Sequence, residues 1–168
     1  MNFQFYKEKL EDAKVFEDFM QKYPDAFPCS AFFVMDKMGA DNKQHFDFYS
    51  PKENKMFSFA LENGVQEVPV QAFKDIDITK ISLEHDFDLD DIEKAVEEKK
   101  IKEGVNNITQ KLLLSMQNIK GKDFLVGTIF VSSMGMIKAT ISLPDLEILD
   151  FEKKSFFDMM NVFKKKKS

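Results

Sequence analysis

The chain of 168 residues lacks arginine and tryptophan and contains a single cysteine, so all 24 of its basic residues are lysines. Arginine is the side chain that forms bidentate hydrogen bonds with phosphate groups and with the edges of guanine bases. Its absence, together with a net charge of −5, argues against sequence-specific nucleic-acid binding. With only Cys29 available, one chain can form neither an internal disulfide nor an all-cysteine metal site.

Long apolar runs are also missing. A membrane-spanning helix needs about 18 or more consecutive apolar residues, and the sequence contains no such stretch. Residues 1–8 have neither the basic region nor the apolar stretch of a secretory signal. We therefore expect a cytoplasmic protein, and the hydrophobic share of 43% predicts a folded chain with a substantial core.

The stretch from Asp88 to Leu143 predicts a long amphipathic helix followed by two strands. Carboxylates at its start suit the positive end of a helix dipole. Its apolar residues recur at spacings of three and four, as on one face of a helix: Ile92, Ala95, Val96, Ile101, Val105, Ile108, Leu112 and Met116. Gly104 predicts a kink or a division into two helices. Gly121 predicts the end of the helix, and the β-branched and alternating residues that follow predict two strands, at residues 123–133 and 135–143.

The first half repeats this order. Residues 6–23 predict an amphipathic helix that ends before Pro24. Apolar or alternating runs then predict strands at 29–38, 44–50 and 56–61 and an edge strand near 65–73. At the end of the second half, similar runs predict a closing strand near 146–151 and a short helix at 155–163. The expected fold class is α+β, with two α-β-β-β units in which long amphipathic helices pack on antiparallel sheet. The units would be residues 1–75 and 76–163, related by an internal duplication and followed by a lysine tail at 164–168, and a single continuous domain is the alternative.

Three features of the second half occur together. Ile81-Ser82-Leu83 leads into an acidic helix that contains alanine, Ser133-Met134-Gly135 joins two strands, and Ala139 to Leu149 combines a strand, an acidic turn and a closing strand. In these features the stretch from roughly Ile76 to Phe163 resembles the PepSY family, small domains named from peptidase propeptides. The resemblance implies a PepSY- or cystatin-like binding or inhibitory module, with a helix packed on an antiparallel sheet and no catalytic residues.

The acidic run at residues 84–91 suggests a calcium loop as one interpretation. Asp86, Asp88, Asp90 and Glu97 fall at positions 1, 3, 5 and 12 of an EF-hand loop. Position 6 needs glycine for the sharp turn, but Asp91 occupies it. We therefore favour the acidic N-terminus of a helix and expect no metal or cofactor.

Catalysis by a thiolate and a histidine base would depend on Cys29 with His45 or His85. Cys29 begins an apolar strand, where an unreactive buried cysteine is the usual outcome. His45 and Asp47 lie two residues apart on a strand and therefore share one face, as a polar surface pair. Zinc would need more ligands than two histidines and one cysteine supply. We expect no enzymatic activity.

The C-terminal lysines, Lys164 to Lys167, follow an apolar stretch that contains Phe156, Phe157 and Phe163. A membrane-surface anchor is one interpretation. A solvated tail is the favoured one, with the phenylalanines in the core or at a dimer interface.

Aromatic residues make up 13% of the chain, and we expect this to exceed what one small interior holds. An exposed apolar face would follow. We therefore expect a soluble, non-enzymatic interaction module that binds another protein or itself. The alternative is a small-molecule or lipid carrier with an apolar cavity between helix and sheet.

Overall fold

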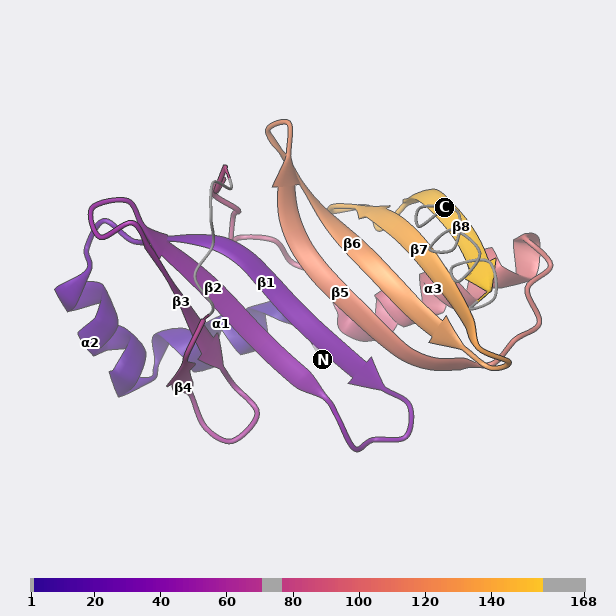
Figure 1. The fold of residues 1–168 in the computed structure, drawn as a ribbon, viewed down its shortest axis with the longest axis horizontal. Helices are drawn as coiled ribbons and strands as arrows, with labels where there is room; N and C mark the ends of the chain where they lie inside the picture. The colour runs from indigo at the N-terminus through magenta and orange to yellow at the C-terminus, as the bar shows by residue number, and fades with distance from the viewer. Residues whose placement is uncertain (1, 71–76, 156–168) are drawn as a thin grey trace, which may run out of the picture.

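The computed structural model describes residues 2–70 and 77–155 (Figure 1). Its elements, in chain order, are α1 (Phe3–Glu11), α2 (Lys14–Lys22), β1 (Phe27–Asp36), β2 (Lys43–Ser50), β3 (Lys55–Ala60), β4 (Gln66–Val68), α3 (Leu89–Lys102), β5 (Thr109–Ile119), β6 (Lys122–Val131), β7 (Gly135–Ser142) and β8 (Ile148–Ser155). The predicted boundary near residue 75 and the predicted lysine tail and C-terminal helix, apart from Ser155, lie outside the described residues. In the described part of the chain, no helix is long and apolar enough to cross a membrane.

The strands form one eight-stranded sheet in the order β4-β3-β2-β1-β5-β6-β7-β8, and every neighbouring pair is antiparallel. Consecutive strands pair with each other, apart from β4 and β5, and the pairing that joins the two halves is between β1 and β5. These two strands pair in the middle of the sheet, where Phe33 lies opposite Leu114 and Val34 opposite Leu113. The strands of both halves therefore belong to a single continuous sheet.

All three helices pack on one face of this sheet, and Figure 1 shows α1 and α3 passing behind the strands. Aromatic rings fill the space between α1, α2 and the N-terminal strands. Phe3 of α1 is completely buried and contacts the rings of Phe33 and Phe46, at centroid distances of 6.0 Å and 5.8 Å. Phe19 of α2 contacts Phe59 at 4.9 Å. These ring pairs hold the helices against the sheet, because edge-to-face contacts add to the burial of the rings.

The predicted fold class is wrong in the length of its helices and in its two three-stranded units. The helices contain 9, 9 and 14 residues. Each half contributes four strands, so the molecule is mostly antiparallel sheet. The helix predicted over residues 6–23 is two helices, because the chain breaks at Asp12 and Ala13.

The predicted central helix ends much earlier than expected. Its start is confirmed, since the Asp88 side chain accepts a hydrogen bond from the Asp90 backbone N–H and caps α3. The helix ends at Lys102, before Gly104 adopts a φ of +71°. The following residues form β5, with Leu112, Leu114 and Met116 buried on the helix-covered face. Ile108, Leu112 and Met116 had supported a helix, but a spacing of four also fits the two-residue period of a strand.

The other predicted strands are confirmed with small shifts at their ends. The alternation in β2 places Phe46 and Phe48 on the helix-covered face, where both are buried. The edge strand predicted near Pro69 is the short β4, which pairs only with β3. The chain therefore places its strands where the sequence predicts them, with a strand in place of the second half of the long helix.

Candidate functional site

The face of the sheet opposite the helices is the main candidate site. Among the described residues, no helix covers it. Strand register assigns its members, because residues opposite one another in a ladder point to the same side. Phe32 pairs with His45 and Ser115, and Phe130 pairs with Lys111 and Met136. We call this surface the open face. Its apolar members include Phe27, Phe32, Val34, Leu113, Phe124, Val126, Phe130 and Met136.

Most apolar side chains of the open face remain partly accessible to solvent. Phe130 is 38% exposed, and Phe32 and Phe124 are partly exposed, whereas Phe33, the next residue to Phe32, is completely buried under α1. Small hydroxyl residues separate the apolar ones: Ser30, Ser58, Ser115, Thr128 and Thr140. The sequence had predicted an exposed apolar face from aromatic content alone, without locating it.

Charged residues of the open face lie on β2, near the start of β5 and on β8. Lys43 of β2 and Lys111 of β5 both contact Asp41, at 3.4 Å and 3.0 Å. On β8, Lys154 lies 3.7 Å from Glu152. The apolar side chains of β1, β6 and the middle of β5 therefore lie between these charged positions. Over β6–β8 the face is hollowed by about 480 Å³, beside Lys138 and Thr140.

Cys29 is buried, and its Sγ donates to the backbone oxygen of Asp47 at 3.4 Å. Burial and the nearby Asp47 carboxylate raise the pKa of the Cys29 thiol to about 12. A thiol with this pKa stays protonated near neutral pH, and only the thiolate is a good nucleophile. The structure therefore supports the interpretation of Cys29 as an unreactive core residue.

Each histidine pairs with a carboxylate that the sequence did not suggest. His45 Nε2 lies 2.9 Å from Glu62 Oε1, while Asp47 accepts from the Ser30 hydroxyl at 2.6 Å. His45 and Asp47 do share the open face, as expected. His85 Nε2 lies 2.7 Å from Asp123 Oδ2. No local pattern could have linked His85 to Asp123, because they are 38 residues apart.

The carboxylates of the acidic run do not gather around one point. Asp86 accepts from the Asn2 side chain, Asp88 caps α3, and Glu97 contacts Lys100 and Thr109 on the far side of that helix. Across the described ranges, no group of three or more His, Cys, Asp or Glu residues could hold a metal ion. Phe156, Phe157, Phe163 and Lys164 to Lys167, the predicted membrane-contacting residues, lie outside the described residues.

Comparison with known proteins supports the fold and nothing more specific. The sequence matches no family model, and no curated protein matches it significantly. The structure is similar to the crystal structure of a protein from Clostridium difficile 630 described as a "putative lipoprotein". The TM-score is 0.52 at 13% sequence identity, and the match covers 83% of this chain and 90% of that chain. The resemblance to the PepSY family stays a prediction.

Proposed function

We propose that this chain is a non-enzymatic binding module that docks another protein on the open face. The observation that carries the proposal is the row of partly exposed aromatic side chains on the central strands, with Phe130 38% exposed. Contiguous exposed apolar surface of this kind marks interaction sites on proteins. A charged rim around an apolar centre is also the usual arrangement of protein interfaces.

The composition of the face favours a separable protein partner over a permanent second copy of this chain. Obligate dimer interfaces are more apolar than the rest of the surface, whereas non-obligate ones mix apolar and polar area. Here Ser30, Ser115 and Thr128 lie among the phenylalanines. Aromatic side chains supply contact area, and small hydroxyl side chains supply adaptable hydrogen bonds, a combination found in antibody paratopes.

A carrier with an apolar cavity between helix and sheet is less well supported. The space between α1, α2 and β1–β3 is filled by buried rings such as Phe3, Phe46 and Phe59. A bound lipid would have to displace these contacts, and removing such a ring typically costs about 3–5 kcal/mol.

The described side chains also favour binding over catalysis. Cys29 is buried and its pKa is about 12, which removes it as a nucleophile. Both histidines are paired with carboxylates, and neither forms a hydrogen bond to a serine, threonine or cysteine among the described residues. A base without a neighbouring nucleophile supplies no route to covalent catalysis.

The test uses two steps with one matched pair of positions. A photoreactive phenylalanine analogue is placed at Phe130 on the open face or at Ile101, which is 79% exposed on α3. We expect one protein to be cross-linked in cells from position 130 and not from position 101. That protein is then purified and its affinity measured by calorimetry.

In the second step, the change Phe130→Ser should weaken binding about tenfold or more, because a buried aromatic anchor contributes about 1.4 kcal/mol or more. Ile101→Ser should leave the affinity within about twofold, as expected outside an interface. Equal effects of the two changes would refute the proposal. Light scattering on the purified chain gives a separate check, since a dimer that Phe130→Ser dissociates would make the occupant a second copy.

A further inference from the structure

Exposed apolar side chains occupy two hairpin turns and the start of a strand at one end of the sheet. Met38 lies in the turn between β1 and β2, Met134 lies in the turn between β6 and β7, and Ile108 directly precedes β5. Met38, Ile108 and Met134 are 85%, 73% and 60% exposed. We call these three side chains the apolar tips. Figure 1 shows both turns along the lower edge of the sheet.

Strand register places the apolar tips at the same end. Asp36, the last residue of β1, pairs with Lys111, three residues after Ile108. The Ser132 backbone N–H, in the β6–β7 turn, donates to the Ile108 backbone oxygen at 2.7 Å. The three side chains therefore project from neighbouring parts of one end, although they are far apart in the sequence.

Two hairpin turns at the opposite end have a different composition. The β2–β3 turn consists of Pro51, Lys52, Glu53 and Asn54, and the β5–β6 turn consists of Lys120 and Gly121. These are typical turn residues. Exposed methionines in turns are thus a property of one end of the sheet and not of all its hairpins.

Met134 has a backbone conformation that disfavours methionine. Ser133 and Met134 have φ values of +62° and +57°, in the left-handed region that favours Gly, Asn and Asp. Other side chains cost free energy there, because their Cβ approaches the following carbonyl oxygen. In the β5–β6 turn the second position, with φ +86°, is Gly121. An exposed methionine in a strained turn does not stabilise the fold, which indicates a contact outside the chain.

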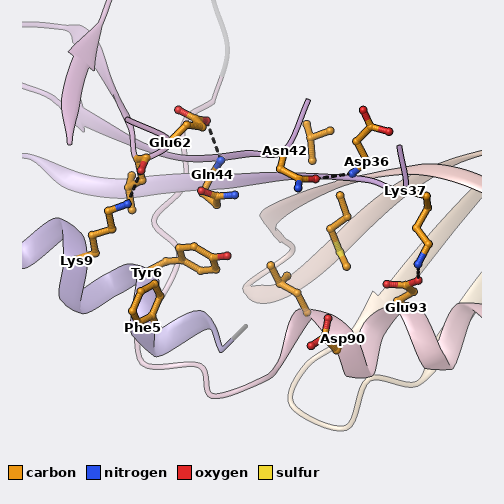
Figure 2. Close-up of a pocket in the computed structure, with 14 residues that line it drawn as sticks. Phe5, Tyr6, Lys9, Asp36, Lys37, Asn42, Gln44, Glu62, Asp90 and Glu93 are labelled. Carbon is orange, nitrogen blue, oxygen red and sulfur yellow. Dashed lines mark hydrogen bonds and ion pairs between the residues drawn. The ribbon is translucent and has the colours of Figure 1, made fainter. Parts of the chain in front are cut away.

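The turn that carries Met38 is tied to the rest of the molecule. The Asp36 backbone N–H donates to Asn42 Oδ1 at 2.7 Å, and Asp36 Oδ1 accepts from the Met38 backbone N–H at 3.0 Å. Figure 2 shows the bond between Asn42 and Asp36 and the contact of Lys37 with Glu93 of α3. Met38 is therefore held in the exposed position by contacts on both sides of it.

Charges around the apolar tips are close to balance. The lysines at this end are Lys37, Lys43, Lys99, Lys100, Lys102, Lys111, Lys153 and Lys154. The carboxylates are Asp36, Asp41, Glu93, Glu97, Glu98, Glu103 and Glu152. Most of them form ion pairs with one another. Attraction to an anionic surface would therefore need further lysines.

The sequence supplies such lysines directly after this end. Ser155, the last residue of β8, pairs with Gly135, which follows Met134. The residues after Ser155 lie outside the described part, and their sequence contains Phe156, Phe157, Phe163 and Lys164 to Lys167. Apolar residues combined with lysines are typical of segments that bind anionic bilayers. The sequence alone favoured a solvated tail, but the position of Ser155 beside the apolar tips favours the membrane interpretation.

We propose that this end of the molecule docks on an anionic lipid bilayer, with the apolar tips inserted between lipid headgroups and Lys164 to Lys167 near the lipid phosphates. Separate apolar tips suit a fluid bilayer, because lipid closes around each of them, whereas a protein interface has a contiguous, complementary core. The argument uses turns at the sheet end and not the centre of the open face, so it does not depend on the proposed function.

The experiment measures binding of the full chain to vesicles of equal amounts of phosphatidylcholine and phosphatidylserine by flotation. Met38→Ser and Met134→Asn should each weaken binding about fivefold or more, because less apolar surface leaves water. The control is Ile119→Ser, since Ile119 is 40% exposed at the opposite end of β5; it should change binding by less than about twofold. Vesicles of phosphatidylcholine alone should bind about tenfold more weakly or worse, because the lysines lose their anionic partners.

Met134→Asn also separates loss of contact from loss of fold. Asn tolerates the left-handed conformation, so this variant should unfold at a higher urea concentration than the wild type while it binds vesicles more weakly. A lower unfolding midpoint with weaker binding would overturn the assignment of Met134 to the lipid contact.

A fluorescent label tests insertion directly. The only natural cysteine, Cys29, is buried, so a dye can be attached to Met134→Cys or, as the control, to Ile119→Cys. Lipids with a quencher on the acyl chain should quench the dye at position 134 and not the dye at position 119. No binding to the anionic vesicles, equal binding to both vesicle types, or an unquenched dye at position 134 on bound protein would overturn the proposal. The last result would assign the apolar tips to a protein partner.

Discussion

Asp123 is expected to be the polar residue whose replacement destabilises the fold most clearly. Its side chain is buried, and its hydrogen bonds join the segment that precedes α3 to the β5–β6 hairpin. One oxygen, Oδ2, accepts from the Ser82 backbone N–H at 2.8 Å and lies 2.7 Å from His85 Nε2. The other, Oδ1, accepts from Asn118 Nδ2 at 2.9 Å.

The change Asp123→Asn preserves shape and replaces one acceptor oxygen with an NH₂ donor. If the NH₂ takes the Oδ2 position, it faces the Ser82 N–H, and two donors meet. If it takes the Oδ1 position, the Asn118 amide must flip and lose its bond from the Gly121 N–H at 3.1 Å. Hydrogen bonds to a charged group contribute about 1.5–3 kcal/mol and neutral ones about 1 kcal/mol. We therefore expect Asp123→Asn to lower the free energy of unfolding by about 2–4 kcal/mol.

Urea unfolding followed by circular dichroism at pH 7 measures this loss. The control is Asp145→Asn, since Asp145 is exposed and has no ion pair with a described residue; it should change stability by less than about 0.5 kcal/mol. A loss no larger than the control's would show that the Asp123 contacts do not stabilise the fold.

The stabilisation by Asp123 should also depend on pH. Burial by itself would raise the pKa of Asp123, but the bonds from Ser82, His85 and Asn118 outweigh it and hold the pKa below its usual value. A carboxyl with a lowered folded-state pKa stabilises the fold above its unfolded pKa, which is about 3.9. That contribution is lost as the pH falls through the folded-state value. The stability difference between the wild type and Asp123→Asn should therefore shrink below about pH 4.

Two further predictions concern reactivity and cooperativity. Because the pKa of Cys29 is about 12, alkylation by iodoacetamide at pH 7.5 should be at least about a hundredfold slower in the folded chain than in urea, as mass spectrometry would show; equal rates would contradict its burial. The three tyrosines, Tyr6, Tyr23 and Tyr49, all precede β3, so their fluorescence reports on the first half, whereas circular dichroism reports on the whole sheet. The β1–β5 pairing predicts coincident urea transitions, and separated transitions would mean that the halves unfold independently.

Most strands could be predicted because alternation is a local signal. In β2, Phe46 and Phe48 face the helices while His45 and Asp47 face the other side, as their positions in the sequence indicate. Pro69 limits β4 to the sheet edge because proline cannot donate a ladder hydrogen bond. Such features depend on neighbouring residues alone, so no knowledge of the tertiary fold is required.

The face of the sheet on which the helices pack could not be predicted in the same way. The apolar run in β1 predicts a strand with apolar side chains on both faces. In the structure Phe33 lies under α1, whereas Phe32, on the opposite side, faces outward and is only partly buried. Periodicity shows that both faces of a strand are apolar, but it does not show which face receives a helix. An uncovered apolar face therefore has the same sequence pattern as a covered one.

A single long-range pairing explains why the open face could not be located from sequence. The pairing of β1 with β5 places Phe32 and Val34 beside Leu113, which makes the apolar centre of the open face continuous across both halves. On the other side of the sheet, the Phe3 N–H donates to the Phe87 backbone oxygen at 2.9 Å, so the start of α3 lies next to α1. These two segments are also far apart in the sequence and meet only in the folded chain. No residue pattern marks this pairing, because its strands are separated by three other strands and a helix, and the residues of the open face remain scattered along the chain until it forms.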